Sequence, residues 1–466
     1  MISSCKKETH YAIDDTTLEI NDFVWKAMNS YYLWKDKIPA LNDKTFKDQE
    51  ALNDYLSDFS NPDELFESLI YKRDEVDRWS WIVDDYESLL KLFAGVRKTT
   101  GMRIGLVYEN GSNYNIFAYV KYVLPGSDAD FKGIQRGDIF RKINGERLNL
   151  DNYMELLYSD ELDIELAQWN ANDLTDTGNV IHLQKWEINE NPIYIQKIIH
   201  RNNKKIGYLM YNGFTSPYDE QLNNSFAFFQ NQNIDELILD LRYNPGGSVT
   251  TLQNLASMIT GQFTGEVLLK YNWHPQLQKW MKENYPKSLQ RYFVNHMKNG
   301  TPIYHLNLSK VYIIATKSSA SASESLINSL RPYIDVIQFG TPTHGKYTAS
   351  ITLFDSPDFS SSNMKKNHKR ALQPIVIKVS NVQNESDFIN GLSPDIYRAE
   401  DLHNLGILGE ESELLLSTVL NYIDNNTFLK TSSFSSWNTL DFEEEKHMYE
   451  MYLPSSDISE IEAIRR

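Results

Sequence analysis

The sequence contains a single cysteine, fewer basic than acidic residues, and no long apolar run. With Cys5 as the only thiol among 466 residues, no internal disulfide can form, which excludes a disulfide-stapled fold. Lysine and arginine number 46 against 63 aspartates and glutamates, a formal net charge of −17, so nucleic acid is a poor partner because its phosphates are repelled. No apolar run reaches the ~18 residues that a membrane-spanning helix needs.

What remains is the composition of a globular chain. Apolar residues make up 41% and aromatic residues 12%, which excludes a wholly disordered protein, and 21 glycines are too few for a collagen-like repeat. At roughly 100–200 residues per domain, the length predicts about two to four domains.

The residues before Cys5 give this cysteine a possible role. Ile2-Ser3-Ser4 precede it and resemble the lipobox of bacterial lipoproteins, in which the thiol is acylated after the signal is cleaved. The apolar export segment that should come first is missing, so we expect a longer precursor with Cys5 as the lipidation site and residues 1–16 as a tether. The alternative is a chance cysteine on a frayed terminus.

Residues 17–100 predict a helical N-terminal domain. Apolar side chains recur at helical spacing over 17–40, ending at Ile38-Pro39, and a second acidic, leucine-rich stretch covers 46–72. We interpret the aromatic residues of this region as core rather than as a ligand platform.

Residues 101–190 predict a β-rich domain. The turn-containing segment GIQRGDIFRKING at 133–145 resembles the corresponding segment of PDZ domains, in which an extended peptide adds to an exposed strand and loop amides hold its C-terminal carboxylate. The resemblance places that loop at 101–106, and the peptide-binding residues would be Gly101, Met102, Arg103 and Ile104. A small β-barrel without a ligand is the alternative.

Residues 195–430 alternate strand-like and helical patterns, which predicts an α/β layer with buried strands. We expect strands at 206–210, 236–242, 311–315 and 336–339, with active groups just beyond their carboxyl ends. Residues 431–466, rich in serine, glutamate and aspartate, predict a loosely packed tail.

A run of small residues follows the third of these strands, and Ser321 lies in its middle. Leu326, Ile327 and Leu330 then recur as on the buried face of a helix, so the run is expected at a strand-to-helix turn. Ser321 and Glu324 fit a capping box, which explains both without catalysis. It does not explain the run of Ala and Ser, which would allow close approach of another backbone beside free helix amides that stabilise an oxyanion.

The sequence offers two bases for such a nucleophile. His344 and Lys346 follow the fourth strand, 23 and 25 residues after Ser321. Histidine is the usual choice, whereas a lysine serves only if burial lowers its pKa. Composition leaves both open.

The order of these motifs resembles the C-terminal processing (tail-specific) proteases, the S41 serine peptidases. The resemblance rests on Ser-Ala-Ser-Ala-Ser-Glu at 319–324, Gly345-Lys346, and Leu-Arg-Tyr-Asn-Pro-Gly-Gly at 241–247. It implies a ClpP/crotonase-like α/β core behind a helical cap and a PDZ-like insert, with Ser321 as nucleophile and Lys346 as general base. The oxyanion donors would be backbone amides of Gly246 or Gly247 and of Ala322. It also implies polypeptide substrates and no cofactor or metal.

One position departs from that pattern. Many members carry a glutamine four residues after the lysine, where this chain has Ser350. Either Ser350 or another group orients Lys346, or the activity is weak; a catalytically inactive peptide-binding scaffold is the alternative function. His344 could be auxiliary, although a packing role is the simpler interpretation.

Two other motifs fail on context. Residues 340–347 nearly spell a phosphate-binding P-loop, but Tyr347 stands where serine or threonine is required and a strand-like run follows. The ten histidines show no metal-ligand spacing.

The resemblance to exported proteases strengthens the lipoprotein interpretation of Cys5. We therefore expect the protein in the envelope of a Gram-negative bacterium, in the periplasm or on the cell surface, touching the membrane only through a lipid anchor at Cys5.

Overall fold

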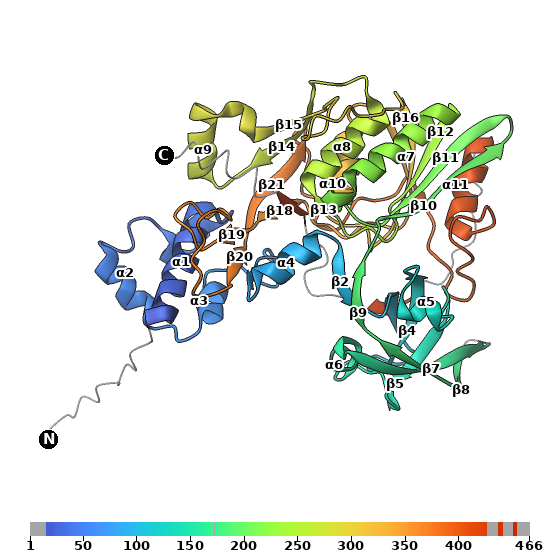
Figure 1. Cartoon of the computed structure of the whole chain (residues 1–466), viewed down its shortest axis with the longest axis horizontal. Helices are drawn as coiled ribbons and strands as arrows, with labels where there is room; N and C mark the ends of the chain where they lie inside the picture. Colours follow the sequence, from blue (N-terminus) through green and yellow to red (C-terminus); the bar gives the residue numbers. More distant parts are fainter. Residues whose placement is uncertain (1–14, 172, 426–436, 441–450, 454–466) are drawn as a thin grey trace.

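The computed structural model describes residues 15–171, 173–425, 437–440 and 451–453. It is a mixed α/β chain, as the sequence predicts, with blue N-terminal helices and a teal β-rich body packed against different parts of a green-to-orange core (Figure 1). Cys5, most of the predicted tether and most of the predicted tail lie outside the described residues.

The N-terminal part is helical, but its first helix is shorter than predicted. It ends at Tyr31 instead of continuing to Ile38, and two 3-10 turns follow. Ile38 is extended, with φ −109° and ψ 109°, because the residue before a proline is pushed out of the helical region. The helices and turns are α1 (Asp15–Tyr31), η1 (Lys35–Lys37), η2 (Pro39–Leu41), α2 (Gln49–Leu56) and α3 (Pro62–Ser68).

A two-stranded ribbon joins the β-rich body to the rest of the chain. Strand β2 (Val96–Thr99) leads into the body and pairs antiparallel with β9 (Trp186–Asn189), which leads out of it. The Glu190 amide donates to the Gly95 carbonyl at 2.9 Å at the base of the ribbon. The chain therefore enters and leaves the body at neighbouring points.

The body itself is a twisted sheet with its own apolar core. The strand order is β23-β3-β4-β5-β7-β8, with β6 paired to β5. Its elements are β3 (Met102–Tyr108), β4 (Ile116–Val123), α5 (Asp128–Phe131), β5 (Ile139–Ile143), β6 (Glu146–Arg147), α6 (Tyr153–Tyr158), β7 (Glu161–Asn170), β8 (Asp173–Gln184) and, from the C-terminal region, β23 (Thr439–Leu440).

The core is built on a six-stranded sheet in the order β10-β11-β12-β16-β17-β22. The four predicted strands are confirmed as β11, β12, β16 and β17, which are parallel neighbours, so their carboxyl ends meet at one edge. The bounds are β10 (Ile193–Arg201), β11 (Lys204–Tyr211), β12 (Glu236–Asp240), β16 (Lys310–Ala315), β17 (Asp335–Gly340) and β22 (Ile396–Tyr397).

Helices cover both faces of this sheet. Leu237 and Leu239 face the larger apolar cluster, and Ile238 between them faces the smaller one, which is the alternation that a strand imposes. Helices α7 (Asp219–Gln232), α8 (Val249–Thr260) and α10 (Ala322–Leu330) belong to the first cluster, and α11 (Leu414–Asn425) belongs to the second.

A second six-stranded sheet lies next to the carboxyl edge of the first. Its order is β13-β24-β18-β21-β14-β15, and the predicted strand after Lys346 is divided into β18 and β19. The bounds are β13 (Gly247–Ser248), β14 (Val267–Asn272), β15 (Gln290–Tyr292), β18 (Thr348–Ile351), β21 (Ile375–Asn381) and β24 (Met451–Leu453).

The remaining elements are connections and a small third sheet, β1-β20-β19. They are β1 (Trp81–Val83), α4 (Tyr86–Phe93), η3 (Ser216–Tyr218), α9 (Pro275–Asn284), η4 (Pro286–Leu289), β19 (Leu353–Phe354) and β20 (Ala371–Gln373). Within the part of the chain that the structure describes, no helix combines the length and the apolarity needed to cross a bilayer.

Candidate active site

Ser321 lies at the turn between β16 and α10, where the sequence predicts it. Its backbone has φ +63° and ψ −112°, a conformation that a residue with a side chain adopts only when its surroundings impose it. The residue is fully buried, and the Glu324 amide faces its side chain in the predicted capping box, but its Oγ has no hydrogen bond of standard geometry among the described residues. A strained, unpartnered hydroxyl at a strand-to-helix turn is available for chemistry.

The glycine loop after β12 packs directly against this turn. The Ala320 amide donates to the Asn244 carbonyl at 3.1 Å, and the Ser323 hydroxyl donates to the same oxygen at 3.0 Å. A Cβ atom on Gly246 would lie 2.7 Å from the Ser321 Cβ. Only glycine allows this approach, so the loop and the turn form one wall of the site.

The candidate oxyanion donors are not equivalent. The Gly246 amide already donates to Asn244 Oδ1 at 2.9 Å, so its contribution is the close approach rather than a free N–H. Gly247 has φ +133°, which orients the peptide units of this turn differently from an ordinary strand. Ala322 is the first residue of α10, and the first amides of a helix have no acceptor within the helix.

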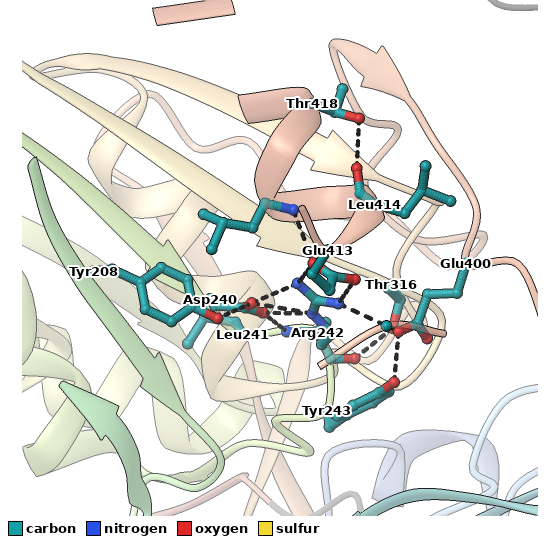
Figure 2. Close-up of polar contacts among 12 residues, drawn as sticks. Tyr208, Asp240, Leu241, Arg242, Tyr243, Thr316, Glu400, Glu413, Leu414 and Thr418 are labelled. Atoms are coloured by element: carbon teal, nitrogen blue, oxygen red, sulfur yellow. Dashed lines mark hydrogen bonds and ion pairs between the residues drawn. The ribbon is translucent and has the colours of Figure 1, made fainter. Parts of the chain in front are cut away.

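A buried charge network surrounds Arg242, just before the glycine loop in the sequence (Figure 2). The Arg242 guanidinium is fully buried between Asp240, at 2.8 Å, and Glu413, at 2.6 Å. Thr316, which follows β16, donates its hydroxyl to the Arg242 carbonyl. Because Arg242 comes only two residues before the Asn244-Pro245-Gly246-Gly247 turn, this network fixes where the turn begins.

Glu400 extends the network to the β-rich body. It accepts hydrogen bonds from Tyr243 at 2.6 Å and from Arg136 at 2.7 Å. Burial alone would raise the pKa of Glu400, but Arg136 and Arg242 hold the pKa at about 2. Arg136 lies in the 133–145 segment of that body, so this ion pair joins the body to the network beside the glycine loop.

Glu324 links the serine turn to the loop that carries Lys346. Its Oε2 accepts from the Ser321 amide at 2.8 Å and from the Lys346 amide at 2.9 Å. Its Oε1 accepts from the Thr343 hydroxyl at 2.5 Å and from the Gly345 amide at 2.7 Å. The backbones of the nucleophile and base candidates are therefore held by a single carboxylate oxygen.

Glu324 is fully enclosed in this arrangement. Burial raises its pKa to about 7, even though its four donors act in the opposite direction. The sequence motif explains only the bond to the Ser321 amide; the three bonds to residues 343–346 are additional.

Lys346 is fully buried, and its Nζ lies 5.5 Å from the centroid of the Trp79 ring. Trp79 comes from the N-terminal part of the chain, just before β1. The Asp77 carboxylate accepts from the Trp79 amide, and the Ser80 hydroxyl accepts from the Ile375 amide at 2.8 Å, which fastens this segment to β21. The base candidate thus has an aromatic neighbour that the sequence interpretation assigned only to the core.

Ser350, the position that departs from the family pattern, belongs to a buried polar chain. Gln373 on β20 donates through Nε2 to Ser350 Oγ at 2.8 Å, and its Oε1 accepts from Thr352 at 2.7 Å. Ser350 itself donates to the Met451 carbonyl at 3.2 Å. A glutamine is therefore present beside this position, supplied by a neighbouring strand.

His344 is buried in the loop before Lys346. Its amide donates to the Ser319 carbonyl at 3.0 Å, and its carbonyl accepts from Lys317 Nζ at 3.1 Å. These backbone contacts fasten the two loops of the site together.

The predicted peptide-binding residues lie apart from this centre, at the start of β3. Gly101 has φ +93°, and a Cβ atom there would lie 2.0 Å from the Ser127 Cβ. Met102, Arg103 and Ile104 are buried strand residues instead of a loop. Arg103 forms an ion pair with Glu190. The edge of β3 that does not pair with β4 pairs instead with strand β23, at Leu106 and Val107.

The sequence interpretation missed the links that assemble the site. Glu324 appears in the motif only as a helix cap, and Trp79 and Gln373 carry no local signal at all. Their partners are far away along the chain, so only the tertiary structure brings them to Ser321, Lys346 and Ser350.

Comparisons with known proteins point to one family. The Peptidase family S41 profile matches residues 205–397, and the Peptidase S41 N-terminal domain profile matches residues 19–81. A carboxyl-terminal-processing protease from Picosynechococcus sp. is 26% identical over 238 residues, which cover 50% of this chain and 52% of that protein. A Staphylococcus aureus protein described as a CtpA-like serine protease is 21% identical over 233 residues, covering 49% of this chain and 42% of that protein. The chain thus spans about half the length of these curated relatives.

A solved structure shares the fold over nearly the whole chain. A crystal structure of a Bacteroides fragilis protein described as an S41 protease has a TM-score of 0.66 and 24% sequence identity, covering 90% of this chain and 100% of that one. The likeness extends over the helical N-terminal part, the β-rich body and the core together.

Proposed function

Because the chain belongs to peptidase family S41, we propose that it is a serine endopeptidase that cleaves unfolded or C-terminally exposed polypeptides with a Ser321–Lys346 dyad. Ser321 Oγ attacks the scissile carbonyl, and Lys346 takes its proton and returns it to the leaving amine. The amides of Gly247 and Ala322 hold the oxyanion. No cofactor or metal takes part in this scheme.

The observation that carries the proposal is the single Glu324 oxygen that binds both backbones. Its contacts of 2.8 Å to the Ser321 amide and 2.9 Å to the Lys346 amide keep the two residues next to each other. The unpartnered Ser321 hydroxyl and the buried Lys346 are what a nucleophile and its base require.

Casein, an unstructured polypeptide, provides the direct test. We expect the full chain to cleave it, and Ser321→Ala and Lys346→Ala to abolish cleavage while leaving the circular dichroism spectrum unchanged. Absence of turnover in a folded, full-length sample at every pH tested would favour the non-catalytic scaffold instead.

The identity of the base is tested separately. A base must be unprotonated to act, so the rate should rise toward alkaline pH. Lys346→Arg keeps the charge but cannot deprotonate, and it should be inactive. Full activity of this variant would transfer the role to His344.

We also propose that the body at residues 101–190 recruits a polypeptide substrate by binding the C-terminus of that substrate. The support is the PDZ-like motif together with a β3 edge that accepts an added strand. Amidation of the C-terminus of a fluorescent model peptide should weaken its binding to this body. Equal binding of the acid and the amide would leave the body a spacer or a lid.

Finally, we propose that the enzyme works in the cell envelope of a Gram-negative bacterium, anchored by a lipid on Cys5. The support is the residue context of Cys5. When the gene is expressed with its upstream sequence, labelled palmitate should be incorporated and Cys5→Ser should abolish the labelling. A stop codon directly before Met1 in the gene would contradict this proposal without affecting the dyad.

A further inference from the structure

A strand from the C-terminal region lies inside the candidate active site. Strand β24 inserts between β13 and β18 and runs parallel to both. Met451 pairs with Gly247 on one side, and Tyr452 pairs with Ser350 on the other. Since β13 begins in the glycine loop and β18 follows Lys346, this strand separates the two edges that flank the dyad.

Each of the three residues of β24 is buried against the surrounding elements. Met451 is fully buried, and its sulfur accepts a weak hydrogen bond from the Ser325 hydroxyl at 3.5 Å, one turn into α10. The Tyr452 ring stacks on Phe93 at 3.9 Å between centroids and 11° between planes. Leu453 is 3% exposed. The slot between β13 and β18 that holds this strand thus accepts large apolar and aromatic side chains on an extended backbone.

The slot continues into open space beside the glycine loop. A cavity of about 50 Å³ has Gly246, Gly247, Phe93 and Tyr452 among its lining residues. Strand β24 therefore lines the same cavity as the glycine loop.

The same C-terminal region also occupies the edge of the β-rich body. Strand β23 pairs antiparallel with β3, Leu440 opposite Leu106 and Thr439 opposite Val107, and the Tyr108 amide donates to the Asn438 carbonyl at 3.0 Å. The Trp437 ring packs 5.3 Å from that of Trp169. Both surfaces that we assign to polypeptide, the β3 edge and the slot at the dyad, are thus filled by one region of the chain.

We propose that the slot between β13 and β18 is the substrate-binding site for an extended polypeptide, and that strand β24 occupies it as an intramolecular inhibitor. This inference rests on the proposed peptidase function. A polypeptide entering the slot would make the same main-chain bonds to Gly247–Ser248 and Ser350–Ile351 that β24 makes. The two cannot bind together, so substrate must displace β24.

Tethering makes β24 an effective competitor. A segment joined to the enzyme by a short linker is present at an effective concentration of order millimolar. The apparent affinity for substrate falls in proportion to the fraction of molecules with an open slot. The enzyme would therefore be held at low activity until a substrate or another factor removes the C-terminal strands.

Binding measurements test this without relying on turnover. In the full chain carrying Ser321→Ala, Tyr452→Ala removes the stack on Phe93, and Tyr304→Ala is the matched control because Tyr304 is an exposed tyrosine outside the slot. We expect Tyr452→Ala to bind fluorescein-labelled casein at least ~5-fold more tightly by anisotropy, with the control unchanged. In the chain that keeps Ser321, Tyr452→Ala should raise the rate of casein cleavage. A synthetic peptide with the sequence of residues 437–453 should inhibit this cleavage competitively.

A second measurement covers the case in which Tyr452→Ala fails to fold. Hydrogen exchange of the otherwise unaltered Ser321→Ala chain should show the amides of residues 451–453 losing protection when casein binds. Protection that persists under saturating casein, or unchanged or weaker casein binding by a folded Tyr452→Ala variant, would overturn the inference and make β24 an ordinary strand of the sheet. If casein displaces β24 but is never cleaved by the Ser321 chain, the slot assignment stands and the peptidase proposal fails.

Discussion

The contact between Gly246 and Ser321 is so close that the site has no room for even one additional carbon atom at position 246. The backbone of Gly246 has φ +110°, and any Cβ there would overlap the Ser321 Cβ and the Ala322 nitrogen. Two separate costs would follow from a side chain, namely a strained backbone and a displaced Ser321.

A pair of glycine substitutions separates these costs. Gly265 also has a positive φ, +92°, but no atom lies within 4 Å of its would-be Cβ. We expect Gly265→Ala to lower the free energy of unfolding by about 1 kcal/mol and to keep full activity. Gly246→Ala should cost roughly 2–4 kcal/mol and lower kcat at least ~10-fold. Equal effects in urea denaturation and peptide hydrolysis would show that crowding of Ser321 is unimportant.

Glu324 makes stability depend on pH in a direction unusual for a carboxylate. Burial raises its pKa from 4.5 to about 7, so the folded state binds a proton more tightly than the unfolded state does. The stability that this provides is complete below pH 4.5 and is lost as pH rises through 7. The loss amounts to about 3 kcal/mol.

Urea denaturation between pH 4.5 and 8 measures this contribution. The decline in the free energy of unfolding should be smaller in Glu324→Gln, which cannot ionise, even though that variant is less stable overall because two of its four donors lose their acceptor. Glu283→Gln, at an exposed position, should follow the wild-type curve. An identical pH dependence in Glu324→Gln and the wild type would contradict the assignment.

At the scale of elements, the segment before β1 delivers an aromatic ring from the N-terminal part to Lys346. The ring of Trp79 is stacked by the Arg78 guanidinium at 4.6 Å and faces the lysine Nζ at 5.5 Å. Contacts of this kind contribute about 0.5–2 kcal/mol.

Removal of this ring should affect catalysis more than folding. We expect Trp79→Ala to lower kcat by about 3- to 30-fold with little change in KM, because the lysine is no longer held in one place, and Trp79→Phe to restore most of the rate. Trp186→Ala, a partly exposed tryptophan on β9, should keep wild-type kcat. Undiminished kcat in Trp79→Ala would assign the ring to packing alone.

The sequence predicted the elements that have a strong apolar periodicity and turn-forming residues at their ends. The four parallel strands and the turn holding Ser321 are confirmed because each is a short apolar run followed by small or turn-forming residues. The first helix was predicted too long, since apolar spacing continues past Tyr31 although the α-helix ends there and two 3-10 turns follow.

What the sequence could not give were contacts between distant residues. His344 and Lys346 could not be ranked by composition, and the contacts that Lys346 makes with Glu324 and with the Trp79 ring join residues far apart in the sequence. Likewise, Gln373 lies on a different strand from Ser350, so no local spacing indicates that it hydrogen-bonds to Ser350. Strand β24 lies in a region whose composition predicts a loose tail, and its burial depends entirely on the slot that receives it.

At the scale of the whole molecule, the Arg136–Glu400 ion pair joins the β-rich body to the core. The pKa of Glu400, about 2, lies below its ordinary value of 4.5, so this carboxylate stabilises the fold above pH 4.5 and the contribution is lost as pH falls toward 2. Its size is about 3 kcal/mol.

Removal of Arg136 should therefore shift acid unfolding. Arg136→Met takes away one of the two cations that hold Glu400 ionised, so the midpoint of acid unfolding, followed by tryptophan fluorescence, should move to higher pH. Arg147→Met is the control because Arg147 pairs with Glu109 within the body and is 43% exposed, and it should leave the midpoint in place. A midpoint unchanged in Arg136→Met would show that Arg242 alone suffices.

The ribbon formed by β2 and β9 has a consequence for how such a chain is put together. Because residues 95 and 190 are hydrogen-bonded to each other, the ninety-odd residues between them form a cassette whose two ends already meet. A short turn could close that gap, and a different module could open it, without rerouting any strand of the core. The architecture is therefore open to exchange by insertion or deletion at one genetic locus, and the β-rich body can change while the core stays the same.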